Sequence, residues 1–208
     1  MRLPAIVLLA LAACTSVDAA PTPDASDLRS VGAFHGLDIS TVLEVELVIG
    51  PTTRVELRGP VDWLAKLETK VDAGVLHVSM HGHPTHIPKL HAIITTPELT
   101  SIDIAGTAAV HATKLAAKTF AVSVSGTGQL DLAGTADTLE VTIAGTGALM
   151  AQDLVTATTN LDIAGTGQTT IHATKLADVR VSGTGSITVV GNPVIRKHIT
   201  GVAAFGSP

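Results

Sequence analysis

The sequence predicts an all-β fold: a parallel, right-handed β-helix of about six coils that follows a β-rich N-terminal region. One observation is a glycine-containing motif that recurs six times after residue 99. Another is an apolar–polar–apolar alternation in phase with every copy. A third is the scarcity of Phe, Trp and Tyr, which make up 2% of the 208 residues. Val, Ile, Leu and Ala must then fill the interior, and these side chains suit evenly layered packing.

The repeat is 18 to 20 residues long. A unit of that length cannot bury its own apolar face, but it can when stacked on a neighbour at about 4.8 Å. Because the columns keep the same polarity in every copy, they favour parallel coils over a hairpin-built sandwich or barrel with antiparallel pairing. Parallel crossovers are overwhelmingly right-handed. The six copies read IAGTA, VSGTG, IAGTG, IAGTG, VSGTG and ITGVA.

Alignment on the first glycine of each copy places one strand before the motif and another after it. The residues two and four positions before that glycine are apolar in nearly every copy, and the residue between them is mostly polar. This alternation is typical of a strand with one buried face. A second inward column lies four positions after the glycine and comprises Val110, Leu130, Leu149, Thr169, Ile187 and Phe205.

The Gly-Thr-Gly motif itself is interpreted as a structural corner. We expect its first glycine to adopt a positive φ that turns the strand, and its second to allow close approach of the next coil. The threonines between them would stack along the rod; a binding ladder of threonines is the functional alternative. No helix is predicted after any copy, so a phosphate cradle is not favoured. The predicted corner residues are Gly106, Thr107, Gly126, Thr127, Gly128, Gly145, Thr146, Gly147, Gly165, Thr166, Gly167, Gly183, Thr184 and Gly185.

The N-terminus has the pattern of an export signal. A mildly basic start is followed by the apolar run 3–13, which is too short to span a bilayer. The sequence Leu-Ala-Ala-Cys ending at Cys14 resembles the lipobox of bacterial lipoproteins, which implies cleavage after residue 13 and lipidation of Cys14. The alternative is an ordinary secretory signal with an incidental cysteine. Residues 14–30 are small, polar and proline-containing, which predicts a flexible tether.

Residues 31–98 are expected to form the β-rich N-terminal part of the same domain as the repeats, which span 99–205. Period-two alternation predicts strands within 37–49, 53–58, 75–80 and 91–96. Trp63, Leu64, Leu67 and Val71 have helical spacing, so 60–71 is predicted to be a short helix or a covering loop. The segment 81–91 is predicted to be a loop.

Three histidines in that loop are candidate metal ligands. His81, His83 and His86 could present imidazoles to Zn or Cu. No acidic residue lies within the segment to orient an imidazole, so solvated loop histidines are the alternative. No metal or other cofactor is expected.

Catalytic arrangements are not evident among the outward columns. Asp103 and Asp162 share a column but lie three coils, or about 14 Å, apart, which is too far for hydrolysis by paired carboxylates. Asp162 and Arg180 are one coil apart and are expected to form a surface ion pair. The net charge of −5 leaves no basic footprint for nucleic acid. The chain is therefore not expected to be an enzyme or a nucleic-acid-binding protein.

The whole layout resembles the auto-transporter adhesin head GIN domain family of bacterial envelope proteins. The likeness rests on the Trp63–Leu67 segment, the Gly-Val-Leu-His-Val strand at 74–78, the Thr-Thr-Pro-Glu-Leu segment at 95–99 and the tandem glycine corners. The family commonly has Ser-Gly-Ser-Gly where this chain has Ala-Gly-Thr-Gly or Ser-Gly-Thr-Gly. The resemblance implies a β-helical fold and a surface or periplasmic location.

These observations lead to the hypothesis of a non-enzymatic, lipid-anchored protein of the outer membrane or cell surface. Its rod would serve adhesion or envelope assembly, with an envelope protein or a glycan as partner. The alternatives are a polysaccharide-acting β-helix enzyme and a metal-binding protein. The oligomeric state stays open, because an uncapped β-helix end exposes backbone groups. The degenerate last repeat, with Lys197 and Val202, is expected to act as a cap.

Overall fold

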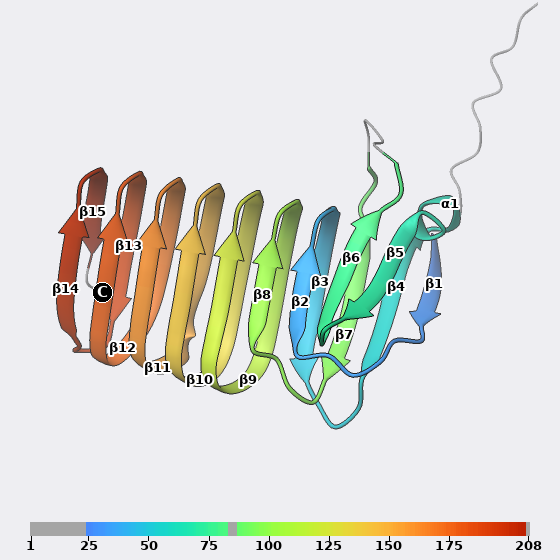
Figure 1. Cartoon of the computed structure of the whole chain (residues 1–208), viewed down its shortest axis with the longest axis horizontal. Coiled ribbons are helices and arrows are strands. Elements are labelled where there is room, and N and C mark those ends of the chain that lie inside the picture. The colour runs from blue at the N-terminus through green and yellow to red at the C-terminus, as the bar shows by residue number, and fades with distance from the viewer. Residues whose placement is uncertain (1–23, 83–86, 207–208) are drawn as a thin grey trace, which may run out of the picture.

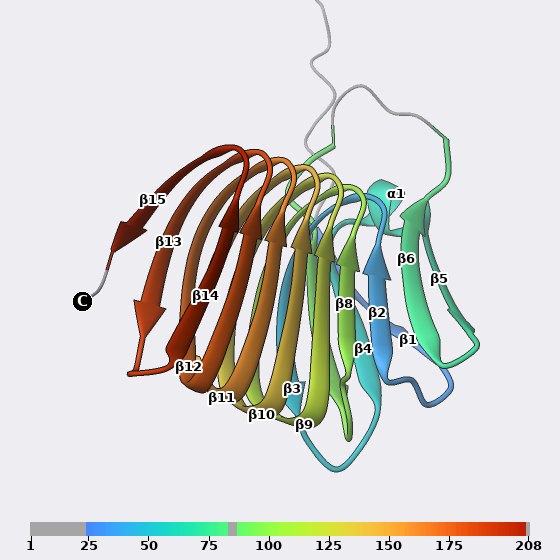
Figure 2. The same cartoon turned by 60° about the vertical axis from the view of Figure 1, so that its left-hand side comes forward.

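A computed structural model describes residues 24–82 and 87–206 and shows a flattened parallel β-solenoid (Figure 1). Within the parallel stack the front strands rise and the back strands descend while the coil advances toward the C-terminus, which makes the coil right-handed (Figures 1 and 2). The six glycine corners bound about five turns. The predicted fold class is therefore confirmed.

Each full coil is built largely from one long, bent strand. These strands are β9 (Thr107–Val124), β10 (Thr127–Ile143), β11 (Thr146–Ile163) and β12 (Thr166–Val181). Each begins at a corner, descends the back face, bends at the lower edge and rises along the front face (Figure 2). Neighbouring strands pair in parallel, with Thr127 opposite Thr146 and Ile143 opposite Ile163.

The remaining strands extend the two faces. On the back face lie β1 (Asp24–Arg29), β4 (Arg54–Pro60), β7 (His91–Thr96), β3 (Val42–Ile49), β13 (Thr184–Val190) and β15 (Val202–Gly206). On the front face lie β5 (Leu67–Asp72), β6 (Val75–Met80), β2 (Gly36–Ile39), β8 (Ser101–Ile104) and β14 (Val194–Ile199). The parallel stack thus gives way to antiparallel pairs at the N-terminal end, where β1 pairs with β4 and β5 with β6.

The core consists of the predicted inward columns. Val124, Ile143 and Ile163 are at most 1% exposed, and the column after the corner is at most 2% exposed from Val110 to Ile187. Leu, Ile and Val fill most of this interior, with Phe120 as a fully buried aromatic. Each coil therefore supplies the same few apolar side chains to a continuous layer of packing.

The corners are joined to one another by backbone hydrogen bonds. The Thr127 amide donates to the Gly106 carbonyl at 2.9 Å, and the Thr146 amide donates to the Gly126 carbonyl at the same distance. A Cβ on Gly145 would overlap the Gly126 carbonyl oxygen, whereas a Cβ on Gly147 would meet only the side chain of Ile143. The first glycine therefore permits close stacking of coils, and the expected positive φ at that position is wrong, because none of the first glycines has one.

The bend at the lower edge of each coil, here called the return, is where repeats of different length differ. Register shifts occur between Asp131 and Ala133 and between Ala151 and Val155, where one coil holds more residues than the next. Positive φ values at Lys114 (60°) and Gly134 (142°) also lie in returns. The residues at the corners therefore stay in register from coil to coil, whereas the number of residues in the returns varies.

A coil without a glycine motif precedes the repeats. β2 pairs with β8 and β3 with β9, so Val42 lies beside Thr107 and Leu43 beside Ala108. The turn through Ser40 and Thr41 occupies the place of the glycine corner, and Thr41 accepts a hydrogen bond from the Thr107 amide at 3.1 Å. The solenoid therefore begins within the segment predicted only as β-rich.

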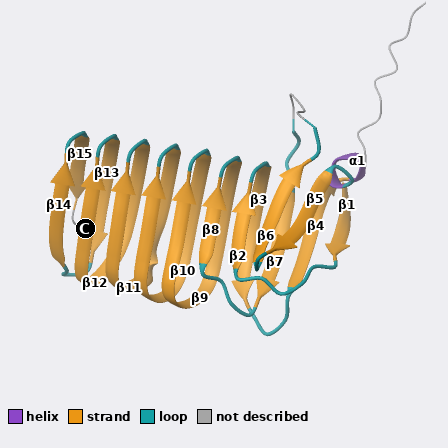
Figure 3. Cartoon of the chain, viewed as in Figure 1, coloured by secondary structure: helices purple, strands orange, loops and turns teal. Residues whose placement is uncertain are grey.

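Two expectations for the N-terminal part are corrected. Residues 24–29 belong to the fold, because β1 lies within the predicted tether and pairs along its whole length with β4. The segment 60–71 contains α1 (Val61–Leu64), the single helix among the described residues (Figure 3), and then β5. Leu67 and Val71 are four residues apart, a spacing that fits a strand face as well as a helix. The positive φ values of Ala73 and Gly74 form the tight turn into β6.

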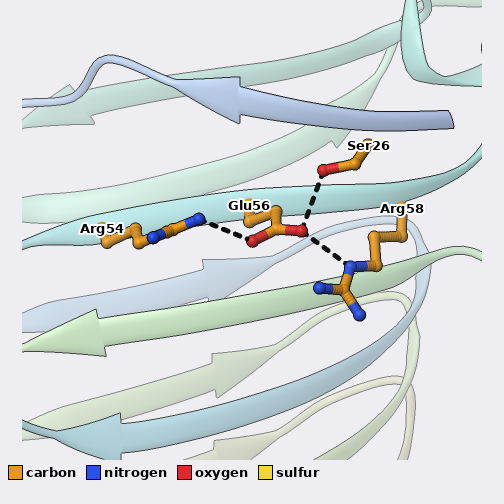
Figure 4. A network of polar contacts seen from close by, with 4 residues as sticks. All are labelled: Ser26, Arg54, Glu56 and Arg58. Atoms are coloured by element: carbon orange, nitrogen blue, oxygen red, sulfur yellow. Dashed lines mark hydrogen bonds and ion pairs between the residues drawn. The ribbon is translucent and has the colours of Figure 1, made fainter.

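A polar network fixes β1 against β4 (Figure 4). Glu56, whose side chain is 11% exposed, accepts hydrogen bonds from Ser26 at 2.8 Å, Arg54 at 3.0 Å and Arg58 at 2.7 Å. The Arg58 bond, followed by that from Ser26, lowers the pKa of the Glu56 carboxyl.

No helix in the described part of the chain has the length and apolar character needed to cross a bilayer.

Candidate ligand-binding trough

A trough of about 1010 Å³ runs along the rod where the corners meet the back face. It reaches from Val42 in the first coil to Val202 in the last. Seven rows at about 4.8 Å give it a length of about 29 Å. We call this hollow the trough.

Three residues of each corner repeat along the trough. The threonines of the Gly-Thr-Gly motif are exposed and line it as Thr107, Thr127, Thr146, Thr166 and Thr184. The second glycines of the motifs are buried and form the floor of the trough. Because glycine has no side chain, nothing projects from this floor. The next position supplies Ala109, Gln129, Ala148, Gln168 and Ser186. A threonine hydroxyl thus recurs in five successive coils, and two of these coils add a side-chain amide.

The N-terminal end of the trough differs from the rest in its charge. The segment 87–90 forms part of its lining, and the Leu90 carbonyl accepts a hydrogen bond from the Glu44 amide at 2.9 Å. Lys89 Nζ lies 3.4 Å from Glu44 Oε1. Among the described residues of the lining these two are the charged ones, and they face one another, so the described lining is otherwise neutral.

A second hollow of about 620 Å³ adjoins the trough on the back face. The two share Glu44, Ala109 and Gln129. The lining of the second hollow includes two His–carboxylate pairs: His91 Nδ1 lies 3.2 Å from Glu44, and His111 Nδ1 lies 3.1 Å from Asp131. The described residues contain no group of three or more His, Cys, Asp or Glu side chains that could hold a metal ion.

The front face carries a pair of carboxylates that the sequence did not reveal. Asp38 on β2 lies beside Asp103 on β8, and His77 Nδ1 is 2.8 Å from Asp38 Oδ2. Burial, followed by the charge of Asp38, raises the pKa of the Asp103 carboxyl, and a hydrogen bond from Ser123 opposes the shift. Neither carboxylate lines the trough or the second hollow.

The other predicted site residues have mixed outcomes. Cys14, His83 and His86 lie outside the described residues, and His81 is exposed at the end of β6. The expected Asp162–Arg180 ion pair is wrong: the two lie side by side, but Arg180 contacts Asp178 on its own strand at 3.3 Å. Gln129 and Gln168 were missed, although their shared column, three positions after the first glycine, is visible in the sequence.

The chain belongs to the family described as "Putative auto-transporter adhesin, head GIN domain", whose model matches residues 33–193. No curated protein matches it significantly. A crystal structure of a "putative adhesin" from Bacteroides fragilis is similar, with a TM-score of 0.75, 23% identity, and coverage of 90% of this chain and 99% of that one.

A "putative lipid binding protein" from Parabacteroides distasonis shares the fold more distantly. Its TM-score is 0.54 at 14% identity, with coverage of 89% of this chain and 96% of that one. At these identities the likeness defines the solenoid fold alone.

Proposed function

We propose that this chain is a non-enzymatic, lipid-anchored envelope protein whose trough binds a neutral, unbranched glycan. The observation that carries the proposal is the trough, which presents the same hydroxyl-bearing corner residue coil after coil. A linear glycan likewise presents hydroxyls at regular intervals. A ligand lying along the rod would therefore meet equivalent groups in successive coils.

The chemistry of the lining favours sugar hydroxyls. Threonine hydroxyls and the amides of Gln129 and Gln168 can each donate and accept hydrogen bonds, as sugar hydroxyls do. The floor of the trough at the buried glycines can pack against the C–H groups of the sugar rings. Because Glu44 and Lys89 face one another, the trough offers no net charge to attract an ionic polymer. Weak contacts in each coil would add up along the chain of sugars.

The positions of the carboxylates support binding rather than catalysis. Glu44 is the only carboxylate among the described residues of the trough lining, and hydrolysis by the common two-carboxylate mechanism needs a pair about 5–10 Å apart. The Asp38–Asp103 pair lies on the opposite face. The surface role is supported by family membership, and the anchor by the lipobox-like sequence at Cys14.

The proposal is tested by screening the purified protein on an array of neutral, linear oligosaccharides and fatty acids. Thr146→Trp would fill the middle of the trough, whereas Thr142→Trp places the same bulk on the front face of the neighbouring strand. We expect binding of linear glycans that Thr146→Trp abolishes and Thr142→Trp retains. Equal binding by both variants, binding of fatty acids alone, or cleavage of a bound glycan would overturn the proposal.

A further inference from the structure

The two ends of the rod differ in charge and carry much of its exposed apolar surface. The last coil, β14 and β15, exposes Val194 (65%), Ile195 (41%), Ile199 (41%) and Val202 (71%). At the opposite end Leu28 is 62% exposed and Val61 47%. Large apolar side chains along the middle of the rod are mostly buried. Exposed apolar groups gathered at two opposite ends indicate contact surfaces.

Both ends also present sheet edges. Within the described chain, β14 pairs only with β12 and β15 only with β13. At the N-terminal end β5 pairs only with β6, and β1 only with β4. The last repeat is therefore a complete coil in register with the stack and does not cover its own edge. Each end offers one front edge and one back edge, and such edges can add strands from another chain.

The charges of these edges are complementary. β14 contains Arg196, Lys197 and His198, and the last coil has no Asp or Glu. On the N-terminal front edge, β5 exposes Glu68 and Asp72 on either side of Lys70. The back edge β1 adds Asp24 and Asp27, although Asp27 pairs with Arg29 at 3.1 Å. A cationic edge meeting an identical one would be repelled, whereas the acidic end is attracted.

We infer that copies of this chain associate head to tail, with the last coil of one rod adding to the N-terminal edges of the next. In a collinear stack β14 would run antiparallel to β5 of the neighbour, because β5 is antiparallel to β6 and the other front strands are parallel. Ile195 and Ile199 would then cover the inward side of β5, where Val71 is only partly buried. Such a contact joins unlike surfaces and does not close, so it builds filaments.

Lys197 has a defined place in this contact. It occupies the inward column that holds Val179 in the preceding coil, and its Nζ lies 3.8 Å from the centre of the Phe205 ring. An inward cation at an open end opposes pairing with a second cationic end. It therefore directs the end toward an acidic partner.

Sedimentation velocity of the full-length chain in detergent tests the inference. Variant A carries Arg196→Glu and His198→Glu, and variant B carries Glu68→Lys and Asp72→Lys; these side chains are exposed, and melting temperatures check that both variants are folded. Thr142→Glu, in the middle of the front face, is the matched control. We expect concentration-dependent association of the wild type and the control, weakened about tenfold or more in A and in B alone. An equimolar mixture of A and B should associate again, because each acidic edge then meets a basic one.

Two results would overturn the inference. A wild-type chain that stays monomeric up to near-millimolar concentration excludes it. Association of variant B alone at wild-type strength, with none for variant A, indicates a tail-to-tail dimer through β14 instead. High salt should weaken the head-to-tail contact, since exposed charges select it.

Discussion

The two glycines of one corner have different neighbours, although the motif presents them as a pair. The first lies against the carbonyl of the preceding corner, and the second lies over the apolar side chains of the core. The sequence shows which positions are glycine, but the reason depends on coil spacing, which emerges only from the stack. Ala108 and Ala203 occupy the second position in two coils, so a methyl group is tolerated there.

We therefore predict unequal effects of two alanine substitutions. Gly145→Ala would drive Cβ into the Gly126 carbonyl and lower the free energy of unfolding by about 2–3 kcal/mol. Gly147→Ala places Cβ 3.1 Å from the Ile143 side chain, which can shift, so we expect a loss of about 1 kcal/mol or less. Urea denaturation of both variants measures the difference. Equal losses would contradict the assignment of the two glycines.

Glu56 is expected to make stability depend on pH. Its pKa in the folded chain lies below the ordinary value of 4.5, so folding favours the ionised carboxylate. The resulting stabilisation is fully present above pH 4.5 and is lost as the pH falls through the folded pKa. Thermal melts of the wild type and Glu56→Gln should differ at neutral pH and converge in acid. A gap that persists unchanged in acid would contradict the network.

At the scale of elements, the predicted solenoid and its inward columns are confirmed because repetition exposes them. Residues that recur in phase identify a face even where single-segment propensity is weak. The first coil was not predicted, because Ser40 and Thr41 stand where the later coils have the glycine motif, so the repeat pattern is missing there. β5 was not predicted, because the apolar spacing of four that suggested a short helix or a covering loop over 60–71 also fits a strand face. The trough also needed the structure, since its lining combines strands with the segment 87–90.

The returns should accept length changes that the corner strands cannot. A serine inserted between Gln152 and Asp153 lies where the register already shifts, and we expect a loss of less than about 1 kcal/mol. The same insertion between Gly147 and Ala148 would turn Leu149 from the core to solvent, with a loss above about 4 kcal/mol. Circular dichroism during urea denaturation checks both. A tolerated insertion in the second position would contradict the strict register of the back strands.

At the scale of the whole molecule, the chain combines a regular rod, whose trough has a neutral lining among the described residues, with an N-terminal sequence that resembles a lipobox. The rod and its family could be predicted from the sequence, with about six coils expected where the structure has about five turns. The sequence does not identify the proposed ligand, because hydroxyl and amide side chains fit many neutral glycans. The proposed anchor rests on the residues around Cys14 alone.

The anchor is tested by substitution. Wild-type protein expressed in a bacterium should carry acyl chains on Cys14 and partition into the detergent phase of a Triton X-114 separation, because each buried CH₂ contributes about 0.8 kcal/mol. Cys14→Ser should lose the added mass by mass spectrometry and move to the aqueous phase. An unmodified Cys14 in the mature protein would indicate an ordinary secretory signal.

The most direct test of the proposed function is the dependence of glycan affinity on chain length. Calorimetry with neutral linear oligosaccharides of increasing length should show affinity rising with each added sugar and levelling off once the trough of about 29 Å is filled. Gln129→Ala and Gln168→Ala should each weaken the longer ligands, whereas Gln152→Ala, outside the trough, should not. Affinity that is independent of length, or equally insensitive to all three substitutions, would contradict binding along the corners.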